Sequence, residues 1–230
     1  WTIIVTGFVE PIFYLLGIGF GLGTLVGDVG DIPYAAFVAP GLMATAAMNG
    51  ALFEATFNLF FKLKYAQTFD AILSTPLGPS DIAVGEVSWA LTRGLLYAIA
   101  FLVVMLVLGL VLSPLGLLMV PGALLIGLAA AAVGMAATTY MRSWKDFDLV
   151  TVVSMPLFLF SGTFYPISVY PDWLETIVEV TPLYRGVHRL RSFATGEVDA
   201  VILFDIAYLS IMGLVGVAIT ARRLRGLLLK

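Results

Sequence analysis

Five charged residues lie within or beside the long apolar segments of this sequence, and they are the first candidates for chemistry. They are Glu10, Glu54, Glu86, Arg93 and Asp205. A charged side chain inside a bilayer is costly, so such residues often mark a functional site. Each of the five lies near the end of its apolar segment, however, where its side chain can reach the polar interface. The segment centres carry no ionisable group, and this argues against a proton relay across a membrane.

The sequence carries no recognisable catalytic or metal-binding pattern. It has no cysteine, and its single histidine, His188, forms no triad pattern with Asp172 or Ser192. A P-loop requires G-x-x-x-x-G-K-[ST], and none of the four lysines follows a glycine. We therefore predict that the chain is not an enzyme and holds no cofactor or metal. ATP hydrolysis through such a loop would need another polypeptide. The net charge of −3 and the lack of a basic run predict no nucleic acid partner.

The elements that position the charged residues are membrane helices. No charged residue and no histidine occur in the 48 positions between Arg93 and Arg142. A spanning helix needs about 20 apolar residues, so this run is long enough for two. Ser113-Pro114-Leu115-Gly116 near its middle marks a turn. With 60% hydrophobic and 12% charged residues, the chain is predicted to be an all-α polytopic membrane protein.

Six transmembrane helices are predicted, within one membrane domain over residues 1–230. The fifth is the shortest, and Pro156 interrupts it. No internal repeat is evident, which disfavours the transporter architectures built on repeats. The predicted spans are 1–26, 34–58, 86–112, 117–141, 149–165 and 200–221.

The distribution of Lys and Arg predicts the orientation, because basic residues accumulate in cytoplasmic loops. Eight of the 12 basic residues follow the second, fourth and sixth spans, whereas Arg185, Arg189 and Arg191 precede the sixth. We therefore expect both termini in the cytoplasm. The eight residues are Lys62, Lys64, Arg142, Lys145, Arg222, Arg223, Arg225 and Lys230.

The connection over residues 59–85 is predicted to contain a short amphipathic helix at the inner membrane surface. Phe61, Tyr65 and Phe69 recur at helical spacing, with polar residues between them. Pro76-Leu77-Gly78-Pro79 ends this helix, and Ser80 or Asp81 is predicted to cap the next one.

The external connection over residues 166–199 is predicted to form a re-entrant helical hairpin. Asp172 fits an N-cap with Glu175 at the third helical position, and Trp173 and Ile177 belong to an apolar face. Thr181-Pro182 ends this first helix. A second helix containing Leu183, Val187 and Leu190 is predicted to close at Gly196.

Three further groups of residues have both a functional and a purely structural interpretation. Gly17, Gly19, Gly21 and Gly23 give small-residue spacings that suit either a subunit interface or tight packing within one bundle. Asn49 lines a polar path or makes an interhelical hydrogen bond. Aromatic residues fit the membrane interfaces or a cargo exit; those assigned to the exit are Phe164, Tyr165 and Trp173.

Several segments resemble the membrane subunit of ABC type-2 exporters, and the resemblance covers nearly the whole chain. The clearest stretch is Tyr34–Gly94, which begins YAAFVAPGLMATAAMNGALFEATFNLFFKLKYAQTFDAILSTPLGP. FVEPIFYLLGIGFGLG (Phe8–Gly23) is similar to the start of such permeases, and FLFSGTFYPISVYPDWLETIVEVTPLYRGVHRLR (Phe158–Arg191) to their external segment. The most similar branches are the nodulation lipo-oligosaccharide exporter permeases and the daunorubicin-type drug exporter permeases.

The resemblance implies an exporter permease of a prokaryotic cytoplasmic (inner) membrane that moves an amphipathic cargo: a lipid-linked saccharide, a lipid or a hydrophobic drug. It implies a dimer of permeases in membrane lipid, with the four glycines at the interface. ATP and magnesium would bind a separate cytoplasmic ABC ATPase. Family members carry a connecting helix before the first span, and because this sequence starts at Trp1, we expect residues before it. The segment between spans two and three would be the coupling helix, with Lys64, Tyr65, Phe69, Asp70, Leu73 and Pro76 docking on the ATPase.

Two other functions remain open at this point. An ion- or proton-coupled secondary transporter would act without an ATPase and depend on Glu10, Glu54 or Asp205. A non-transporting membrane scaffold would hold a soluble partner through residues 59–85.

Overall fold

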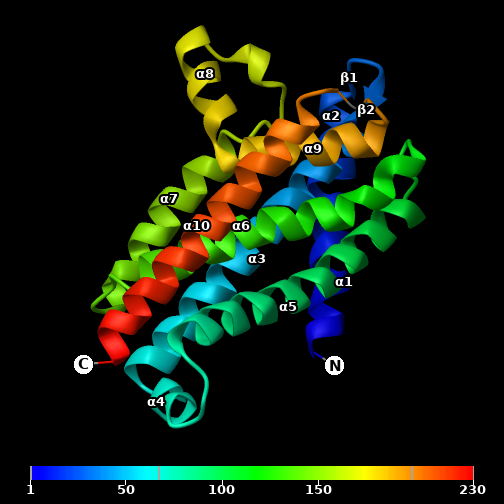
Figure 1. The fold of residues 1–230 in the computed structure, drawn as a ribbon. Coiled ribbons are helices and arrows are strands. Elements are labelled where there is room, and N and C mark those ends of the chain that lie inside the picture. Colours follow the sequence, from blue (N-terminus) through cyan, green and yellow to red (C-terminus); the bar gives the residue numbers. More distant parts are fainter. Residues whose placement is uncertain (1, 67, 198, 230) are drawn as a thin grey trace.

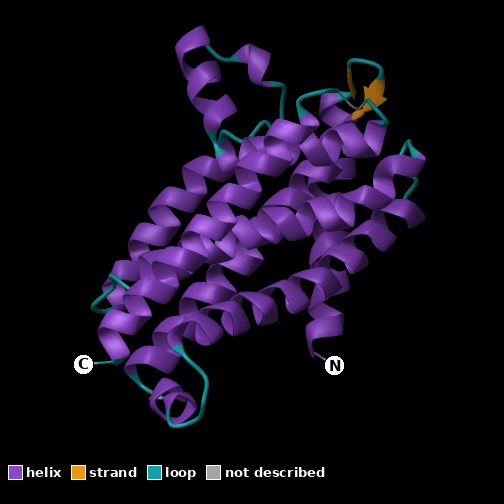
Figure 2. Cartoon of the chain, in the orientation of Figure 1, coloured by secondary structure: helices purple, strands orange, loops and turns teal. Residues whose placement is uncertain are grey.

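The computed structural model describes residues 2–66, 68–197 and 199–229, and nearly all of them lie in helices (Figures 1 and 2). A two-stranded antiparallel hairpin, β1 (Asp28–Val29) and β2 (Ile32–Pro33), is the exception that the sequence did not predict. Gly30 adopts φ 62° in its turn, a conformation that favours glycine. The helical segments are α1 (Thr2–Tyr14), π-helical η1 (Leu15–Leu22), α2 (Gly23–Val26), α3 (Tyr34–Lys64), α4 (Thr68–Leu73), α5 (Pro79–Val107), 3₁₀ η2 (Pro114–Leu118), α6 (Met119–Thr138), 3₁₀ η3 (Trp144–Asp146), α7 (Phe147–Leu159), 3₁₀ η4 (Ile167–Val169), α8 (Asp172–Val180), α9 (Pro182–Thr195) and α10 (Ile202–Leu228).

Among the described residues, five helices are long and apolar enough to cross a membrane. This confirms an all-α polytopic membrane protein. They cover Phe8–Val26, Tyr34–Lys64, Pro79–Val107, Pro114–Thr138 and Ile202–Leu228.

The fifth predicted span, residues 149–165, corresponds to α7, which has 13 residues. At 1.5 Å per residue this helix is about 20 Å long, short of the hydrocarbon thickness of about 30 Å. The chain leaves the helix at Phe160 and turns at Gly162, which adopts φ 69°. A sixth span therefore stays a prediction.

The turn predicted within the uncharged run is confirmed. Helix α5 ends at Val107, and η2 begins after Ser113, whose Oγ accepts a hydrogen bond from the Leu115 N–H at 3.2 Å. The run thus forms two antiparallel helices joined by a short connection.

Different elements lie at the two ends of the bundle. Figure 1 shows the start of α1, the end of α10 and α4 together at one end. The β-hairpin, α8 and α9 lie at the opposite end. Both chain ends therefore lie on the same side of the bundle.

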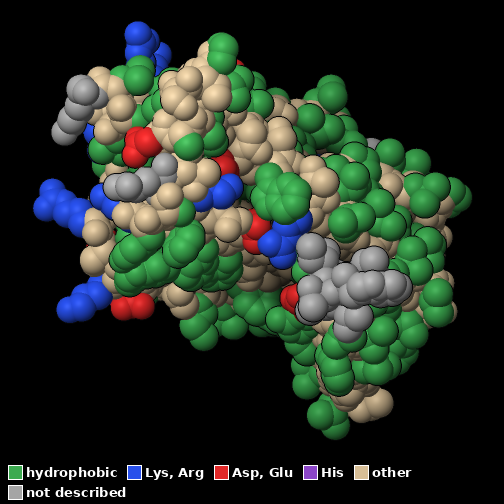
Figure 3. Space-filling model, turned by 90° about the horizontal axis from the view of Figure 1, so that it is seen from below, with side chains coloured by type: hydrophobic (Ala, Val, Ile, Leu, Met, Phe, Trp, Pro, Cys, Tyr) green, Lys and Arg blue, Asp and Glu red, His purple; other side chains and the backbone are tan. Residues whose placement is uncertain are grey.

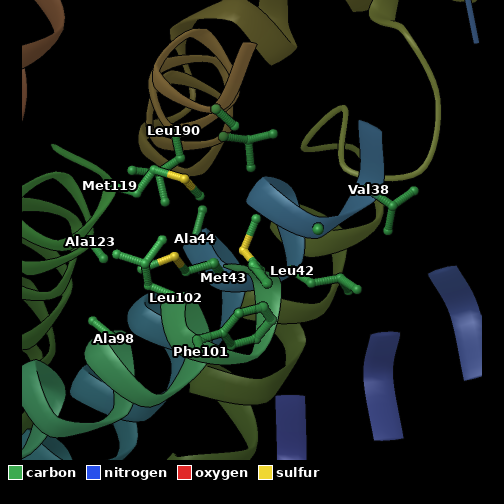
Figure 4. Close-up of a cluster of buried hydrophobic side chains, with 14 of the residues drawn as sticks. Val38, Leu42, Met43, Ala44, Ala98, Phe101, Leu102, Met119, Ala123 and Leu190 are labelled. Atoms are coloured by element: carbon green, nitrogen blue, oxygen red, sulfur yellow. The ribbon is translucent and has the colours of Figure 1, made fainter. Parts of the chain in front are cut away.

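Helix α3 forms the centre of the bundle and packs against α5, α6 and α9. Figure 4 shows side chains of these four helices meeting, among them Met43, Phe101, Met119 and Leu190. Small residues allow the close approaches. A Cβ at Gly216 of α10, for example, would lie 2.7 Å from the Ala132 backbone of α6. Close backbone packing stabilises helix pairs in lipid, where apolar side chains gain little from burial.

The helix ends differ from the prediction at two places. Pro171 occupies the cap position of α8, so the prediction of Asp172 as its N-cap is wrong, and Asp172 begins the helix. Gly78 caps α5, and Asp81, not Ser80, stabilises this end by accepting the Gly78 N–H at 2.7 Å. The Gly196 end of α9 is confirmed, with φ 88°.

Candidate functional site

Two ion pairs join α3 to α5 near the end of the bundle that carries α4. Lys62 Nζ lies 2.7 Å from Glu86 Oε1. About two turns further toward the centre of α3, the Arg93 guanidinium donates to Glu54, which also accepts a hydrogen bond from Asn58. Glu54, Glu86 and Arg93, which the sequence placed near the ends of apolar segments, are therefore paired between helices, which lowers the cost of placing them beside hydrocarbon.

A cavity of about 280 Å³ lies between α1, α3 and α5, directly beside the Glu54–Arg93 pair. Its polar lining includes Glu10 of α1 and Asn49 of α3, and its apolar lining includes Met43 and Phe101. The Asn49 Oδ1 atom is buried and has no hydrogen-bond partner in the described part of the chain. A buried acceptor of this kind favours a ligand that can donate a hydrogen bond. The cavity can therefore hold a polar group next to apolar walls.

The segment over residues 59–85, predicted to be cytoplasmic, is not one continuous amphipathic helix. Phe61 belongs to the end of α3, which continues to Lys64, and only Thr68–Leu73 forms the separate helix α4. Phe69, predicted to contact a partner, is 1% exposed and belongs to a core cluster with Leu59 and Leu224. Its side chain anchors α4 to the bundle and is not offered to solvent. The other predicted docking residues are exposed or half-buried; they are Lys64, Tyr65, Asp70, Leu73 and Pro76.

An aromatic cluster ties this end of α3 to the start of α7. The Tyr65 and Trp144 rings stack with centroids 5.8 Å apart, and Phe60 meets Trp144 edge-on at 5.0 Å. Phe57 and Phe147 stack at 4.4 Å. The sequence did not indicate this contact, because nothing in the spacing brings η3 beside α3. The cluster couples the end of α3 to α7.

Figure 3 views the molecule from the end that carries α4. Lys and Arg side chains project on one side, and hydrophobic side chains cover much of the remaining surface. In the aromatic cluster between α3 and α7, the Tyr65 side chain is 56% exposed and the Trp144 side chain is 46% exposed. This end therefore presents aromatic and basic groups together.

The four glycines of the first span face in two directions. Cβ atoms at Gly19 and Gly23 would lie 3.4 Å from Ala35 and 3.8 Å from Tyr34, so these two positions pack within the chain. Gly17 has no atom of another residue within 4 Å of a Cβ, and Gly21 has only the Leu16 carbonyl of its own helix. The structural interpretation thus holds for Gly19 and Gly23, whereas the other two leave a face open.

A charged cluster lies at the opposite end of the bundle, where α9 meets α10. Arg189 donates to Asp205 Oδ2 at 2.6 Å, and both side chains are almost fully buried. Arg185 Nη1 lies 3.4 Å from Asp205 Oδ1, and His188 Nδ1 lies 3.9 Å from Oδ2. The pairs hold helix α9 on α10, so Asp205 acts as an anchor between these helices.

Arg191 on the other face of α9 holds three segments together without a carboxylate. Its guanidinium lies 3.8 Å from the centroid of the Phe37 ring and donates to the Phe37 carbonyl at 3.1 Å. It also donates to the Gly162 carbonyl at 2.8 Å. Burial lowers the pKa of Arg191 to about 10, so the group stays charged at neutral pH. The sequence did not indicate this role, because the partners of Arg191 are two backbone carbonyls and a phenylalanine ring that are distant in the chain.

The predicted exit aromatics do not form one site. Phe164 packs edge-on against Phe158, which lines the polar cavity together with Asn49. Tyr165 accepts a hydrogen bond from the Tyr170 hydroxyl at 2.8 Å. Trp173 is 67% exposed on α8. Of these three residues, only Phe164 is thus connected with the cavity, through its contact with the Phe158 ring.

Comparison with known proteins identifies the family. A family model described as ABC-2 type transporter matches residues 1–193. Nodulation protein J of Rhizobium leguminosarum bv. viciae is 33% identical over 220 residues, which cover 94% of this chain and 85% of that protein. Nodulation protein J of Sinorhizobium fredii is 31% identical over 79% of this chain and 70% of its own. The inner membrane transport permease YadH of Escherichia coli is 25% identical over 90% and 79%.

The chain therefore belongs to the ABC-2 type transporter family. It is a multi-pass permease of this family, the transmembrane component of a transporter and not its catalytic ATPase.

Proposed function

We propose that the chain is the permease subunit of an ABC exporter that moves an amphipathic cargo out of the cytoplasm or the inner leaflet. One arrangement carries the proposal: α3 and α5 connect the exposed α4 segment directly to the polar cavity, and two ion pairs join these helices. A push on α4 would therefore reach the lining of the cavity.

The force would come from a separate cytoplasmic ABC ATPase that binds ATP and magnesium. Closure of two ATPase subunits would move α4 and shift the permease between two states as a rigid body. Tyr65, Asp70 and Pro76 are exposed at this end and are proposed as docking contacts. Phe69 would act by anchoring α4.

The permease is proposed to work as a homodimer in the inner membrane of a prokaryote, with both termini in the cytoplasm. The open face at Gly17 and Gly21 supports a helix contact with a second copy. The basic residues beside α4 and at the end of α10 support this orientation.

The cargo is proposed to place its polar part beside Asn49 and Glu10 and its apolar part against the surrounding side chains. The resemblance to exporters of lipo-oligosaccharides supports a lipid-linked saccharide, and other lipids or hydrophobic drugs share the same chemistry. The partly exposed polar lining of the cavity suits such a molecule.

Co-purification from native membranes tests the proposal. A P-loop ATPase should accompany the tagged permease in equal amount, and its ATPase rate should change in the complex. Asp70→Lys should weaken both effects, whereas Asp31→Lys, the same change at an exposed acid of the opposite end, should not. An intact permease with no ATPase partner would favour the ion-coupled carrier. A complex that moves nothing would favour the scaffold.

A further inference from the structure

A second cavity, of about 550 Å³, lies between α3, α6, α7 and α10. Its volume falls within the range of about 300–1,000 Å³ that is usual for small-molecule sites. Almost all of its wall is apolar. The lining includes Leu52, Val133, Ala137, Val153, Leu157 and Met212.

Helix α7 forms the outer wall of this cavity and packs loosely against the bundle. Val152, Val153 and Met155 are each at least 60% exposed. An empty apolar space of this size costs dispersion contacts on every side that lines it. A flexible hydrocarbon chain would restore those contacts and join α7 to its neighbours.

Two arginines mark the end of the cavity that faces the α4 side of the bundle. Arg142 lines the cavity itself. Tyr140 also lines it, and the Arg223 guanidinium lies over the Tyr140 ring, 4.2 Å from its centroid. Within the described ranges, neither arginine forms an ion pair with a carboxylate. The Arg223 Nε atom is buried without a hydrogen-bond partner there.

Asp146 also lines the cavity, but its carboxylate is already engaged. Asp146 Oδ2 accepts the backbone N–H groups of Arg142 at 2.6 Å and Ser143 at 3.0 Å. These bonds hold the turn after α6 and leave the Arg142 guanidinium available. The mouth of the cavity thus offers two cationic groups.

We propose that this cavity binds an anionic phospholipid of the inner leaflet. Its phosphate would lie between Arg142 and Arg223, and one acyl chain would fill the apolar space beside α7. Basic pockets between membrane helices on the cytoplasmic side bind anionic headgroups, and arginine suits phosphate oxygens. The inference rests on the membrane orientation proposed above and on no property of the ATPase or the cargo.

Charge complementarity favours an anionic phospholipid over the other possible occupants of this cavity. A zwitterionic lipid would fill the apolar space but gain less from two unpaired arginines. Free phosphate would satisfy the arginines but leave the cavity empty. A second copy of the chain would have to insert apolar side chains between α7 and the bundle.

Native mass spectrometry of the detergent-purified permease, without any ATPase, tests the proposal. Phosphatidylglycerol should bind several-fold more tightly than phosphatidylcholine with the same chains. Arg142→Gln with Arg223→Gln should weaken phosphatidylglycerol binding about tenfold or more, since each basic group near a lipid surface contributes measurably. The matched control, Arg222→Gln with Arg225→Gln, removes the same charge from exposed positions of α10 and should retain the preference.

Ala137→Phe tests the apolar part, because it keeps both arginines and fills the cavity wall. It should reduce binding of both lipids and abolish the rise in thermal unfolding temperature that phosphatidylglycerol gives the unmodified protein. Inorganic phosphate should give no such rise.

Equal binding of the two lipids, or an equal loss in the control variant, would overturn the proposal. So would full lipid binding by Ala137→Phe, or a dimer whose formation excludes the lipid. Each of these outcomes is independent of whether an ATPase partner exists.

Discussion

Lys62 of α3 donates to both carboxylate oxygens of Glu86 of α5, at 2.7 and 2.9 Å, immediately before the chain leaves the bundle for α4. The pair between Glu54 and Arg93 lies deeper and has the opposite polarity, with the anion on α3. Because the two bridges are of opposite sense, a shift of one helix along the other would bring like charges together. Helices α3 and α5 are therefore expected to move as one unit with α4.

Charge reversal at the Lys62–Glu86 pair tests whether α3 and α5 move as one unit with α4. Lys62→Glu or Glu86→Lys alone should place like charges side by side and lower stability by about 1 kcal/mol, the scale of a partly exposed pair. Each should also reduce transport in reconstituted vesicles. The double variant, which restores a pair with exchanged partners, should recover most of both losses. Additive losses in the double variant would show that the two residues act separately.

The inner pair lies beside the polar cavity, and both of its side chains are partly exposed. Arg93→Met leaves Glu54 without its cation and should lower the free energy of unfolding by about 1 kcal/mol, the scale of a partly exposed pair. Glu54→Gln with Arg93→Met removes both charges and should cost less than Arg93→Met alone. Denaturant titration in detergent measures both values. Glu54→Gln also addresses the ion-coupled alternative, which requires complete loss of transport in this variant even with folding intact.

The Arg189–Asp205 pair between α9 and α10 should contribute strongly to stability. Asp205→Asn leaves a buried guanidinium without its carboxylate, and a loss of about 3–5 kcal/mol is expected from unfolding measurements. Asp199 lies 3.5 Å from the same arginine but is 48% exposed. Asp199→Asn should therefore cost less than about 1 kcal/mol. Similar losses in the two variants would contradict the assignment of Asp205 as the anchor of α9.

Gly41 of α3 allows the turn after α7 to approach closely. A Cβ at this position would lie 2.8 Å from the Thr163 side chain and 3.0 Å from its Cα. Gly41→Ala should lower stability by about 1–3 kcal/mol through overpacking. Gly50 on the same helix has nothing within 4 Å, and Gly50→Ala should be neutral or stabilise by up to about 1 kcal/mol. Thermal unfolding of the two variants gives the comparison.

The Asp146 carboxylate predicts a pH dependence at the turn after α6. The backbone N–H groups of Arg142 and Ser143 hold the pKa of Asp146 below its usual range. Because the pKa is lowered in the folded state, the stabilisation is complete above the unfolded value of about 3.9 and is lost as the pH falls through the lowered value. Asp146→Asn should reduce the unfolding temperature at pH 7 and differ less from the unmodified protein near pH 3. An unchanged difference would mean that the carboxylate charge is not involved.

The membrane character and the approximate positions of the helices follow from the sequence. The uncharged run from Gly94 to Met141 can only be placed in lipid, and the structure divides it between Val107 and Pro114, just before most of the predicted Ser113–Gly116 turn. The Gly196 helix end was predictable because a left-handed residue there favours glycine. The β-hairpin was missed, since two-residue strands leave no periodic pattern.

The candidate site was only partly predictable. Asn49 and Glu54 were singled out as polar residues in an apolar segment, and both line the same cavity. The sequence did not indicate their partners, because Arg93 is 39 residues from Glu54. Phe69 was placed on a contact surface by its helical spacing, but the spacing alone does not tell which face of a short amphipathic helix meets the bundle.

The sequence by itself determined that this protein lies in a membrane, that it has no P-loop of its own, and roughly where most of its helices lie. These properties depend on local composition and on motifs read along the chain. Only the tertiary structure decided which charges are paired, which glycines pack inward, and where the cavities lie. Such properties depend on contacts between helices that are distant in sequence, and hydropathy, which records only each residue's own preference for lipid, does not encode them.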